Sequence, residues 1–369
     1  MRIVSAFGPP CSLSSWGVGF LKNVLECAGE AVEFVYKSDV DGLVEAWRSS
    51  SDKACLIYAD LPDDHVIDLY ARTKAPIVVF REAPLDLVSY LMRERAIPLR
   101  DAIATATLFL STYQKFEFRD RMLVVTRKPR SVRGLTEEIL NLFSSDLPPE
   151  TRAETLNRVL ETYGGPASVD ELVCRYGAYG EPSGALGDRL PSEEKDFVER
   201  VLTGYITDAD GGEDNGISWP RELFLLADDP GRHLSGRIEM VGNARFLIYG
   251  PYLCLPFGEW IATVELEIED NASGNILFVD ICGGAEPRLV QFRLPVAGRF
   301  SFSMPVRVSD PRKPIELRAA LGEGAIEGRI DWRGVYFARE IDGVQRELSA
   351  KGLIGSAADD QQGEATELG

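Results

Sequence analysis

The chain has 369 residues, of which 45% are hydrophobic and 27% charged, and its formal net charge is −18 at pH 7. This length predicts about two domains, and the composition is that of a soluble globular protein. The negative charge argues against non-specific binding to nucleic acid or to anionic membranes, because the electrostatic contribution would be repulsive. It still permits one anionic small ligand in a locally positive pocket.

The sequence shows no clear targeting segment, membrane-spanning segment or metal-binding pattern. No apolar run approaches the ~20 residues needed to span a bilayer, and the N-terminus lacks the charged and apolar regions of a signal peptide. The six cysteines contain no C-x-x-C pair, which predicts reduced thiols in a cytoplasmic protein. With only two histidines, a multi-histidine metal site is not expected. The residues are Cys11, Cys27, Cys55, Cys174, Cys254 and Cys282, and His65 and His233.

Apolar strand-like runs alternate with amphipathic helical runs in the first 206 residues. Repeated β-α-β units with short connections predict an α/β fold with a doubly wound, mostly parallel sheet. Ligands bind such sheets beyond the carboxyl ends of the strands. The loop after Phe7, Asp60 and Arg81 are therefore expected to lie together. Strands are expected at 2–7, 33–36, 53–59, 75–80 and 122–126, and helices at 16–25, 42–48, 63–74, 85–95, 99–113, 135–143, 149–163 and 192–202.

The first strand and its turn, RIVSAFGPPCSLSSWGVGFLKNVL at 2–25, carry the first candidate site. Apolar spacing predicts that a helix begins near Trp16. The unpaired N–H groups of a helix N-terminus, together with the hydroxyls of Ser12, Ser14 and Ser15, would hold a phosphate. The alternative is an ordinary βα turn with a serine cap. Cys11 could be a reactive thiol at the helix N-terminus, but neither histidine is well placed to assist it.

The pattern changes in the second half of the chain. Residues 164–190 are rich in Gly, Pro and Ser and predict a loop. Short runs of β-branched and aromatic residues between turns then predict an antiparallel, jelly-roll-like β-sandwich. The expected divisions are an α/β domain at 1–206, an acidic linker at 207–234, a β-sandwich at 235–345 and a disordered tail at 346–369.

Three segments occur in the order, and at about the spacing, of motifs in one enzyme family. PCSLSSW at 10–16 resembles a P-K-S-G-T-T-W phosphosulfate loop that ends at Trp16. IYADLP at 57–62 resembles a strand ending in T-H-L-P, with Asp60 in place of the catalytic histidine. PIVVFREAPLDLVSYL at 76–91 resembles a 3′-phosphate segment, with Ser89 eight residues after Arg81. The segments resemble those of sulfotransferases that use 3′-phosphoadenosine 5′-phosphosulfate (PAPS). A fourth, at 184–205, resembles their late nucleotide-covering loop.

The resemblance implies a P-loop-like phosphate loop, with PAPS or its product PAP as co-substrate and no metal. Backbone amides and hydroxyls from Cys11 to Trp16 would hold the 5′-phosphate and sulfonate. Arg81 and Ser89 would bind the 3′-phosphate, and Asp60 would accept the acceptor's proton. The alternatives are that Arg81 forms a surface ion pair and that Asp60 caps the next helix.

The loop also departs from the family pattern. Cys11 and Leu13 stand where the family has Lys and Gly, so that a cation must come from elsewhere in the chain. Lys22, on the following helix, is expected to point away from the loop. The other candidates are Arg93, Arg95, Arg127, Lys128, Arg130 and Arg133.

The β-rich half carries a second resemblance. FLIYGPYLCLP at 246–256, followed by GEWIATVELEI, is similar to a sandwich module appended to bacterial glycosyltransferases and other glycan-assembly enzymes. Trp260, Trp332 and Tyr336 could stack on a sugar or pack in the core. Together the resemblances imply a divergent sulfotransferase acting on a carbohydrate hydroxyl in bacterial surface-polysaccharide assembly. The alternative is a non-catalytic sulfotransferase-like domain joined to a carbohydrate- or protein-binding sandwich. A homo-oligomer is compatible with the sequence.

Overall fold

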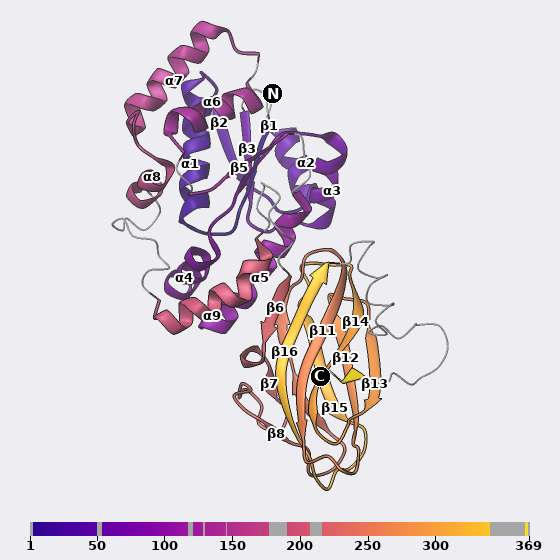
Figure 1. The fold of residues 1–369 in the computed structure, drawn as a ribbon. Coiled ribbons are helices and arrows are strands. Elements are labelled where there is room, and N and C mark those ends of the chain that lie inside the picture. The colour runs from indigo at the N-terminus through magenta and orange to yellow at the C-terminus, as the bar shows by residue number, and fades with distance from the viewer. Residues whose placement is uncertain are drawn as a thin grey trace. The chain divides into compact units, whose positions relative to one another are not determined.

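The computed structural model describes residues 3–49, 54–116, 121–127, 130–144, 146–176, 190–206, 216–339 and 366–367. They form two compact units (Figure 1). Unit 1 consists of Met1–Pro98 and Tyr113–Lys195, and unit 2 of Leu99–Thr112 and Asp196–Gly369. This division differs from the expected boundary at residue 206, because residues 99–112 and residues 196–206 both group with the β-rich unit.

Unit 1 contains a parallel five-stranded sheet in the order β2-β3-β1-β4-β5. All five strands lie within a few residues of the expected positions. The central strands are buried on both faces, as their continuous apolar sequences predict. The strands are β1 (Ile3–Phe7), β2 (Val32–Tyr36), β3 (Ala54–Ala59), β4 (Ile77–Phe80) and β5 (Met122–Val125).

Helices cover both faces of this sheet, which confirms the expected α/β class. Figure 1 shows α1 and α6 on one side and α2 and α3 on the other. The helices of unit 1 are α1 (Ser12–Cys27), α2 (Val40–Ser49), α3 (Asp64–Thr73), α4 (Pro84–Glu94), α6 (Val132–Phe143), α7 (Pro149–Tyr163) and α8 (Val169–Tyr176), with a short 3-10 helix at Gln114–Phe116.

Two of these helices differ from the sequence-based expectation. α1 begins at Ser12, one turn before the expected start, because Leu13 extends its buried stripe toward the N-terminus. α8 lies in the segment that was expected to be a loop. A capping box explains its start: Ser168 Oγ accepts from Glu171 N at 3.2 Å, and Glu171 Oε2 accepts from Ser168 N at 2.9 Å.

The strand order places a topological switch point between β1 and β4. From β1 the chain continues to β2 at one edge of the sheet, and from β4 it continues to β5 at the opposite edge. Connections that leave neighbouring strands in opposite directions open a crevice at their carboxyl ends, where ligands of such folds bind. The β1–α1 loop and the residues after β4 flank this point.

Unit 2 is built around two antiparallel sheets, as expected for a β-sandwich. One has the order β13-β12-β15-β9-β7, with β10 also paired to β15, and the other β17-β14-β11-β16-β6, with β8 also paired to β16. The strands are β6 (Ile217–Pro220), β7 (Leu225–Leu226), β8 (Ile238–Glu239), β9 (Phe246–Tyr249), β10 (Pro251–Leu253), β11 (Gly258–Glu269), β12 (Ile276–Gly283), β13 (Arg288–Arg293), β14 (Gly298–Val308), β15 (Ile315–Leu321), β16 (Arg329–Arg339) and β17 (Thr366–Glu367).

Two helices contribute to unit 2, α5 (Leu99–Tyr113) through its residues 99–112, and α9 (Ser192–Leu202) through the part after Lys195. Thr107 Oγ1 on α5 accepts from Cys254 N at 3.1 Å. Tyr205 donates to the Cys254 carbonyl at 2.8 Å and accepts from Trp219 Nε1 at 3.2 Å. Because these groups are buried, the bonds tie the helical segments to the strands.

The expected linker and tail also differ from the structure where it describes them. β6 and β7 lie within the segment expected to be a linker, because Ile217 and Trp219 alternate into the core. β17 lies in the expected disordered tail and pairs with β14. The rest of the tail and residues 207–215 lie outside the described residues. No helix in the described part of the chain is long and apolar enough to cross a membrane.

Candidate functional site

The loop between β1 and α1 packs tightly against neighbouring strands. Tyr58 on β3 donates to the carbonyl of Gly8 at 2.8 Å. A Cβ atom at Gly8 would lie 2.5 Å from Ser14 Oγ and 2.7 Å from Phe80 Cβ. These contacts are closer than any side chain tolerates, so the close approach of this loop to β4 requires a glycine at position 8.

The N-terminus of α1 presents backbone donors at the end of this loop. The first helical hydrogen bond runs from Ser15 N to Cys11 O at 3.0 Å, so the N–H groups of Ser12 to Ser14 have no acceptor within the helix. Cys11 is the N-cap residue, and its side chain makes no capping hydrogen bond. Pro9 and Pro10 have no N–H to contribute. The helix dipole adds partial positive charge, so an anion can bind where these donors converge.

The side chains of the loop divide into buried and accessible ones. Leu13, Ser14 and Trp16 are buried, Ser12 is half-buried and Ser15 is exposed. Ser14 Oγ lies 3.5 Å from Cys11 Sγ. Of the three serines predicted to bind a phosphate, Ser12 and Ser15 therefore remain accessible, whereas Ser14 stabilises the loop. The Trp16 indole Nε1 is buried without a hydrogen-bond partner.

Cys11 occupies the position of the lysine in the family motif, but its thiol is not exposed. It is 2% exposed. Burial raises its pKa far above the ordinary value, and the nearby Glu82 carboxylate raises it further. The thiol is therefore neutral and poorly nucleophilic, which argues against the reactive-cysteine hypothesis. It supplies no positive charge to the loop.

A buried ion pair lies at the ends of β4 and β5. Glu82 is 3% exposed, and Arg127 binds it with two hydrogen bonds, Nε to Oε1 at 2.7 Å and Nη2 to Oε2 at 3.0 Å. Arg127 Nη1 also lies 3.4 Å from Asp170. Burial raises the pKa of Glu82 above its ordinary value, and Arg127 opposes this rise. Of the cations considered for the loop, Arg127 is thus held by carboxylates.

Sequence reasoning did not predict a role for Glu82. The available signal was its position, because an acidic residue followed a fully apolar strand, and Arg127 followed the next strand at the same edge of the sheet. Parallel strands bring such residues together at their carboxyl ends. The pairing itself depends on the neighbouring positions of β4 and β5.

Arg81 and Ser89 occupy the end of β4 and the helix that follows it. Arg81 is half-buried, and its backbone N–H donates to Val125 O at 2.9 Å. α4 begins three residues later at Pro84. Ser89 on this helix is 2% exposed, and its Oγ has no hydrogen-bond partner. A buried hydroxyl without a partner is costly and is often completed by a ligand or an ordered water.

Asp60 directly follows β3, at the strand end next to the β1 loop. Tyr36 donates to its Oδ1, and Tyr113 donates to its backbone carbonyl. Burial and the bond to Asp60 raise the pKa of Tyr36 to about 12, so Tyr36 stays protonated and keeps donating. Asp60 does not cap α3, because Asp63 is the N-cap residue and accepts from Val66 N at 2.7 Å.

Several other candidate cations are engaged in surface ion pairs. Lys22 pairs with Glu26 at 3.7 Å on the exposed side of α1, as expected. Arg93 pairs with Glu94 at 3.2 Å, and Arg130 lies 3.3 Å from Glu138. Lys128 and residues 177–189, which include most of the expected nucleotide-covering loop, lie outside the described residues.

The aromatic side chains considered for sugar stacking occupy different environments. Trp260 and Trp332 are buried and belong to the core of the sandwich, whereas Tyr336 is 46% exposed. Within the described part of the chain, no group of three or more His, Cys, Asp or Glu residues is placed to hold a metal ion.

Comparisons with known proteins give partial structural similarities. No protein-family model and no curated protein matches the sequence. Mouse sulfotransferase SULT7A1, solved with PAP, matches over 57% of this chain and 85% of its own, with 13% identity and a TM-score of 0.39. TmCBM61, solved with β-1,4-galactotriose, matches over 32% of this chain and 81% of its own, with 14% identity and a TM-score of 0.22.

A third similarity involves the Clostridium thermocellum xylanase Xyn10B, whose CBM22-1 and GH10 modules were solved with xylohexaose. It covers 26% of this chain and 19% of the xylanase chain, with 11% identity and a TM-score of 0.18. At these scores the similarities do not assign a family. The strand order and the residues at the switch point remain the basis for interpreting the site.

Proposed function

We propose that unit 1 binds a 3′-phosphorylated adenine nucleotide, PAPS or PAP, and that the protein transfers the sulfonate of PAPS to a carbohydrate hydroxyl. The observation that carries the proposal is the partnerless, buried hydroxyl of Ser89 on the helix that follows Arg81. This pair has the eight-residue spacing of the 3′-phosphate segment in the resembling family. Arg81 would supply a planar fork for the phosphate and Ser89 a hydroxyl donor.

The other residues at the switch point have complementary roles in this proposal. The α1 N-terminus, with Ser12 and Ser15, would bind the 5′-phosphate and the sulfonate. Asp60 would accept the proton of the attacking hydroxyl through Oδ2, while Tyr36 holds Oδ1. Sulfonate transfer depends mainly on positioning and on electrostatic stabilisation, and preorganised backbone donors can provide both.

Nucleotide binding is tested by calorimetric titration of the full chain with PAP. We expect binding in the wild type and a loss of at least about 10-fold in Arg81→Ala, because a charge-assisted hydrogen bond contributes about 1.5–3 kcal/mol. Ser89→Ala should bind PAP more weakly while its unliganded stability is unchanged or higher, because the variant removes a buried group without a partner. Arg93→Ala, on the same helix, is the matched control. No heat from the wild type would contradict the proposal.

A second candidate function is nucleotide binding without transfer. Two observations favour it: the buried neutral thiol of Cys11 replaces a cation, and Glu82 engages Arg127. The two functions are separated by following acceptor-dependent conversion of PAPS to PAP over a panel of oligosaccharides. Transfer that falls 10²–10⁴-fold in Asp60→Asn, with PAP affinity retained, supports the enzyme. PAP binding without conversion on any acceptor supports the binding protein.

A further inference from the structure

The outer side of the β13-β12-β15-β9-β7 sheet carries a cluster of aromatic and charged side chains. We define the β15 face as Phe246, Tyr252, Phe278, Asp280, Glu316 and Arg318. Along β12 and β15, buried residues alternate with these partly exposed ones. The strand register places Asp280 opposite Arg318, Phe278 opposite Ala320 and Pro251 opposite Glu316. The Asp280–Arg318 pair therefore lies between the Phe278–Ala320 pair and the Cys282–Glu316 pair.

The centre of the face is a fixed pair of planar polar groups. Arg318 Nε donates to Asp280 Oδ1 at 3.0 Å, and Arg318 Nη2 donates to Asp280 Oδ2. The Arg318 guanidinium also lies 5.3 Å from the centroid of the Phe246 ring. Two bonds and an aromatic contact hold the guanidinium plane in one orientation. Arginine has five N–H donors, so donors remain for oxygen atoms of a ligand.

Tyr252 is held in an unusual backbone conformation. Its φ of 62° lies in the left-handed region, which is unfavourable for a residue with a side chain. Its hydroxyl donates to Glu316 Oε1 at 2.7 Å, and its ring lies edge-on to Tyr249 at 6.3 Å. Even so, the Tyr252 side chain is 41% exposed and Phe246 is 49% exposed. Backbone strain that presents an aromatic ring to solvent is typical of a ligand-binding position.

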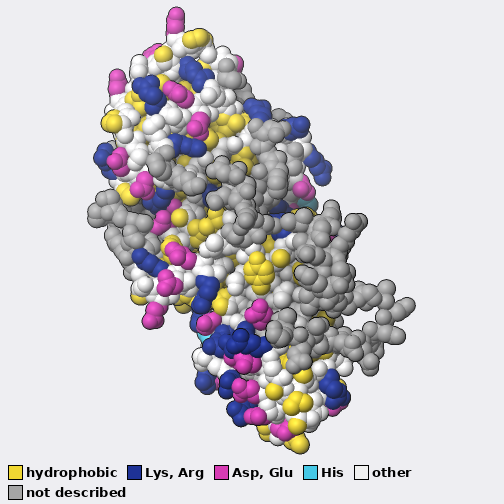
Figure 2. All heavy atoms as spheres, in the orientation of Figure 1, with side chains coloured by type: hydrophobic (Ala, Val, Ile, Leu, Met, Phe, Trp, Pro, Cys, Tyr) yellow, Lys and Arg dark blue, Asp and Glu magenta, His cyan; other side chains and the backbone are white. Residues whose placement is uncertain are grey.

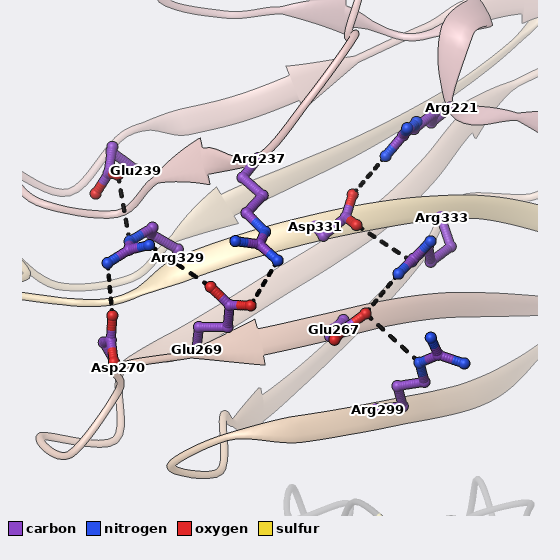
Figure 3. Close-up of polar contacts among 10 residues, drawn as sticks. All are labelled: Arg221, Arg237, Glu239, Glu267, Glu269, Asp270, Arg299, Arg329, Asp331 and Arg333. Atoms are coloured by element: carbon purple, nitrogen blue, oxygen red, sulfur yellow. Dashed lines mark hydrogen bonds and ion pairs between the residues drawn. The ribbon is translucent and has the colours of Figure 1, made fainter.

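The opposite sheet provides a contrast. Figure 3 shows five arginines and five acidic residues on and around β11, β14 and β16, all paired with one another. Figure 2 shows basic and acidic side chains intermingled on this side of the sandwich. On such a surface the charged side chains pair with one another. The β15 face instead combines exposed rings with a small number of oriented polar groups, which is the composition of a small-molecule site.

We infer that the β15 face binds an uncharged sugar residue of a glycan. The Phe246 and Tyr252 rings would pack against the apolar C–H surfaces of sugar rings, and Asp280, Glu316 and Arg318 would exchange hydrogen bonds with hydroxyls. The face has two carboxylates and one guanidinium, so a sulfated or uronic sugar would be repelled. A second arginine, Arg293 on β13, lies on the same side of the sheet. Its guanidinium already donates to the Gly274 carbonyl at 2.6 Å.

This inference rests on the proposed carbohydrate acceptor. It adds that the protein would bind the glycan before sulfation and not after it. A face that binds the unmodified glycan and repels the sulfated one would take up substrate and release product. Its ligand is then made by reactions that assemble uncharged sugars, before any anionic group is added at the bound position. The same discrimination would serve a non-catalytic glycan-binding protein.

The test is binding of the full-length protein to an array of neutral, uronic-acid-containing and sulfated oligosaccharides, followed by calorimetry with the best neutral one. We expect neutral sugars to bind and their sulfated forms to bind at least about 10-fold more weakly. Phe246→Ala and Tyr252→Gly should each lose about 10-fold or more in affinity. Glycine suits a positive φ, so Tyr252→Gly removes the ring while relieving the backbone. Phe34→Ala, which removes an exposed aromatic ring on β2 of unit 1, is the control.

Binding confined to anionic sugars, no binding to any sugar, or affinity unchanged in Phe246→Ala and Tyr252→Gly would overturn the inference. A PAP titration of the same samples keeps the two proposals apart. Failure to bind sugar with PAP binding intact contradicts the β15 face alone. Loss of PAP binding in the wild type contradicts the proposed nucleotide function and leaves the sugar result standing.

Discussion

Glu82 and Arg127 form a buried ion pair at the carboxyl end of the parallel sheet. Its carboxylate is nearly inaccessible to solvent, and the arginine binds both of its oxygens. A buried pair of this kind contributes little net stability relative to apolar residues of the same volume, but breaking it leaves an uncompensated charge. The pair therefore fixes how the ends of β4 and β5 are arranged beside the loop.

Arg127→Met is expected to lower the free energy of unfolding by about 3 kcal/mol, because it leaves Glu82 buried without its partner. The double variant Glu82→Gln with Arg127→Met should recover part of this loss, since no charge is then stranded. Denaturant unfolding of the wild type, both single variants and the double variant measures the coupling. Additive effects in this cycle would show that the two side chains stabilise the fold independently.

At the scale of elements, α1 can pack closely against β4 because glycines lie where the two elements meet. A Cβ atom at Gly17 would lie 2.1 Å from Cε1 of Phe80. Together with Gly8, this lets the first turn of the helix approach the strand closely. The close contact brings the backbone donors of the helix N-terminus to the switch point between β1 and β4.

Gly17→Ala is expected to destabilise the protein by about 1–3 kcal/mol, because the methyl group overlaps the Phe80 ring. Gly19→Ala, two residues further along the same helix, is the matched control. No atom lies within 4 Å of its Cβ position, and alanine should stabilise the helix by up to about 1 kcal/mol. Thermal unfolding of the two variants should therefore shift in opposite directions. Equal shifts would mean that the packing of α1 against β4 is loose.

At the scale of the whole molecule, unit 2 is discontinuous in sequence. Residues 99–112 group with residues 196–369. Thr107 Oγ1 in the first segment accepts a hydrogen bond from the buried N–H of Cys254 in the second. Arg100 on the same helix donates to the Glu222 carbonyl and lies 5.4 Å from the Phe197 ring. The β-rich half is therefore incomplete without a helix that the chain supplies from within the α/β half.

A fragment of residues 196–369 is expected to melt well below unit 2 of the full chain or to aggregate, because the surface that α5 covers becomes exposed. Fusing residues 99–113 to its N-terminus through a flexible linker should restore much of the stability. Melting curves and size-exclusion chromatography of the two fragments compare them directly. Equal stability of both would show that α5 is dispensable for the sandwich.

Local periodicity determined most of the secondary structure. The central strands β1, β3 and β4 were predictable because a strand covered on both faces is almost continuously apolar. Most helices were predictable from their amphipathic spacing. The ends of β1, β3 and β4 were expected together, and the observed order β3-β1-β4 makes these strands neighbours. The positions of Asp60, Arg81 and the Ser12–Ser15 turn at one edge followed from this alone.

Only the tertiary structure decided which of these side chains stay accessible and which are buried or paired. Cys11 and Ser14 are buried, Arg127 is bound to Glu82, and Trp332 lies in the core. The β15 face was equally hidden, because its members come from four strands and only register places Asp280 beside Arg318. The sequence determined the elements, since periodicity is a local property of the chain. Burial and partnership depend on contacts between distant segments, which only the folded molecule specifies.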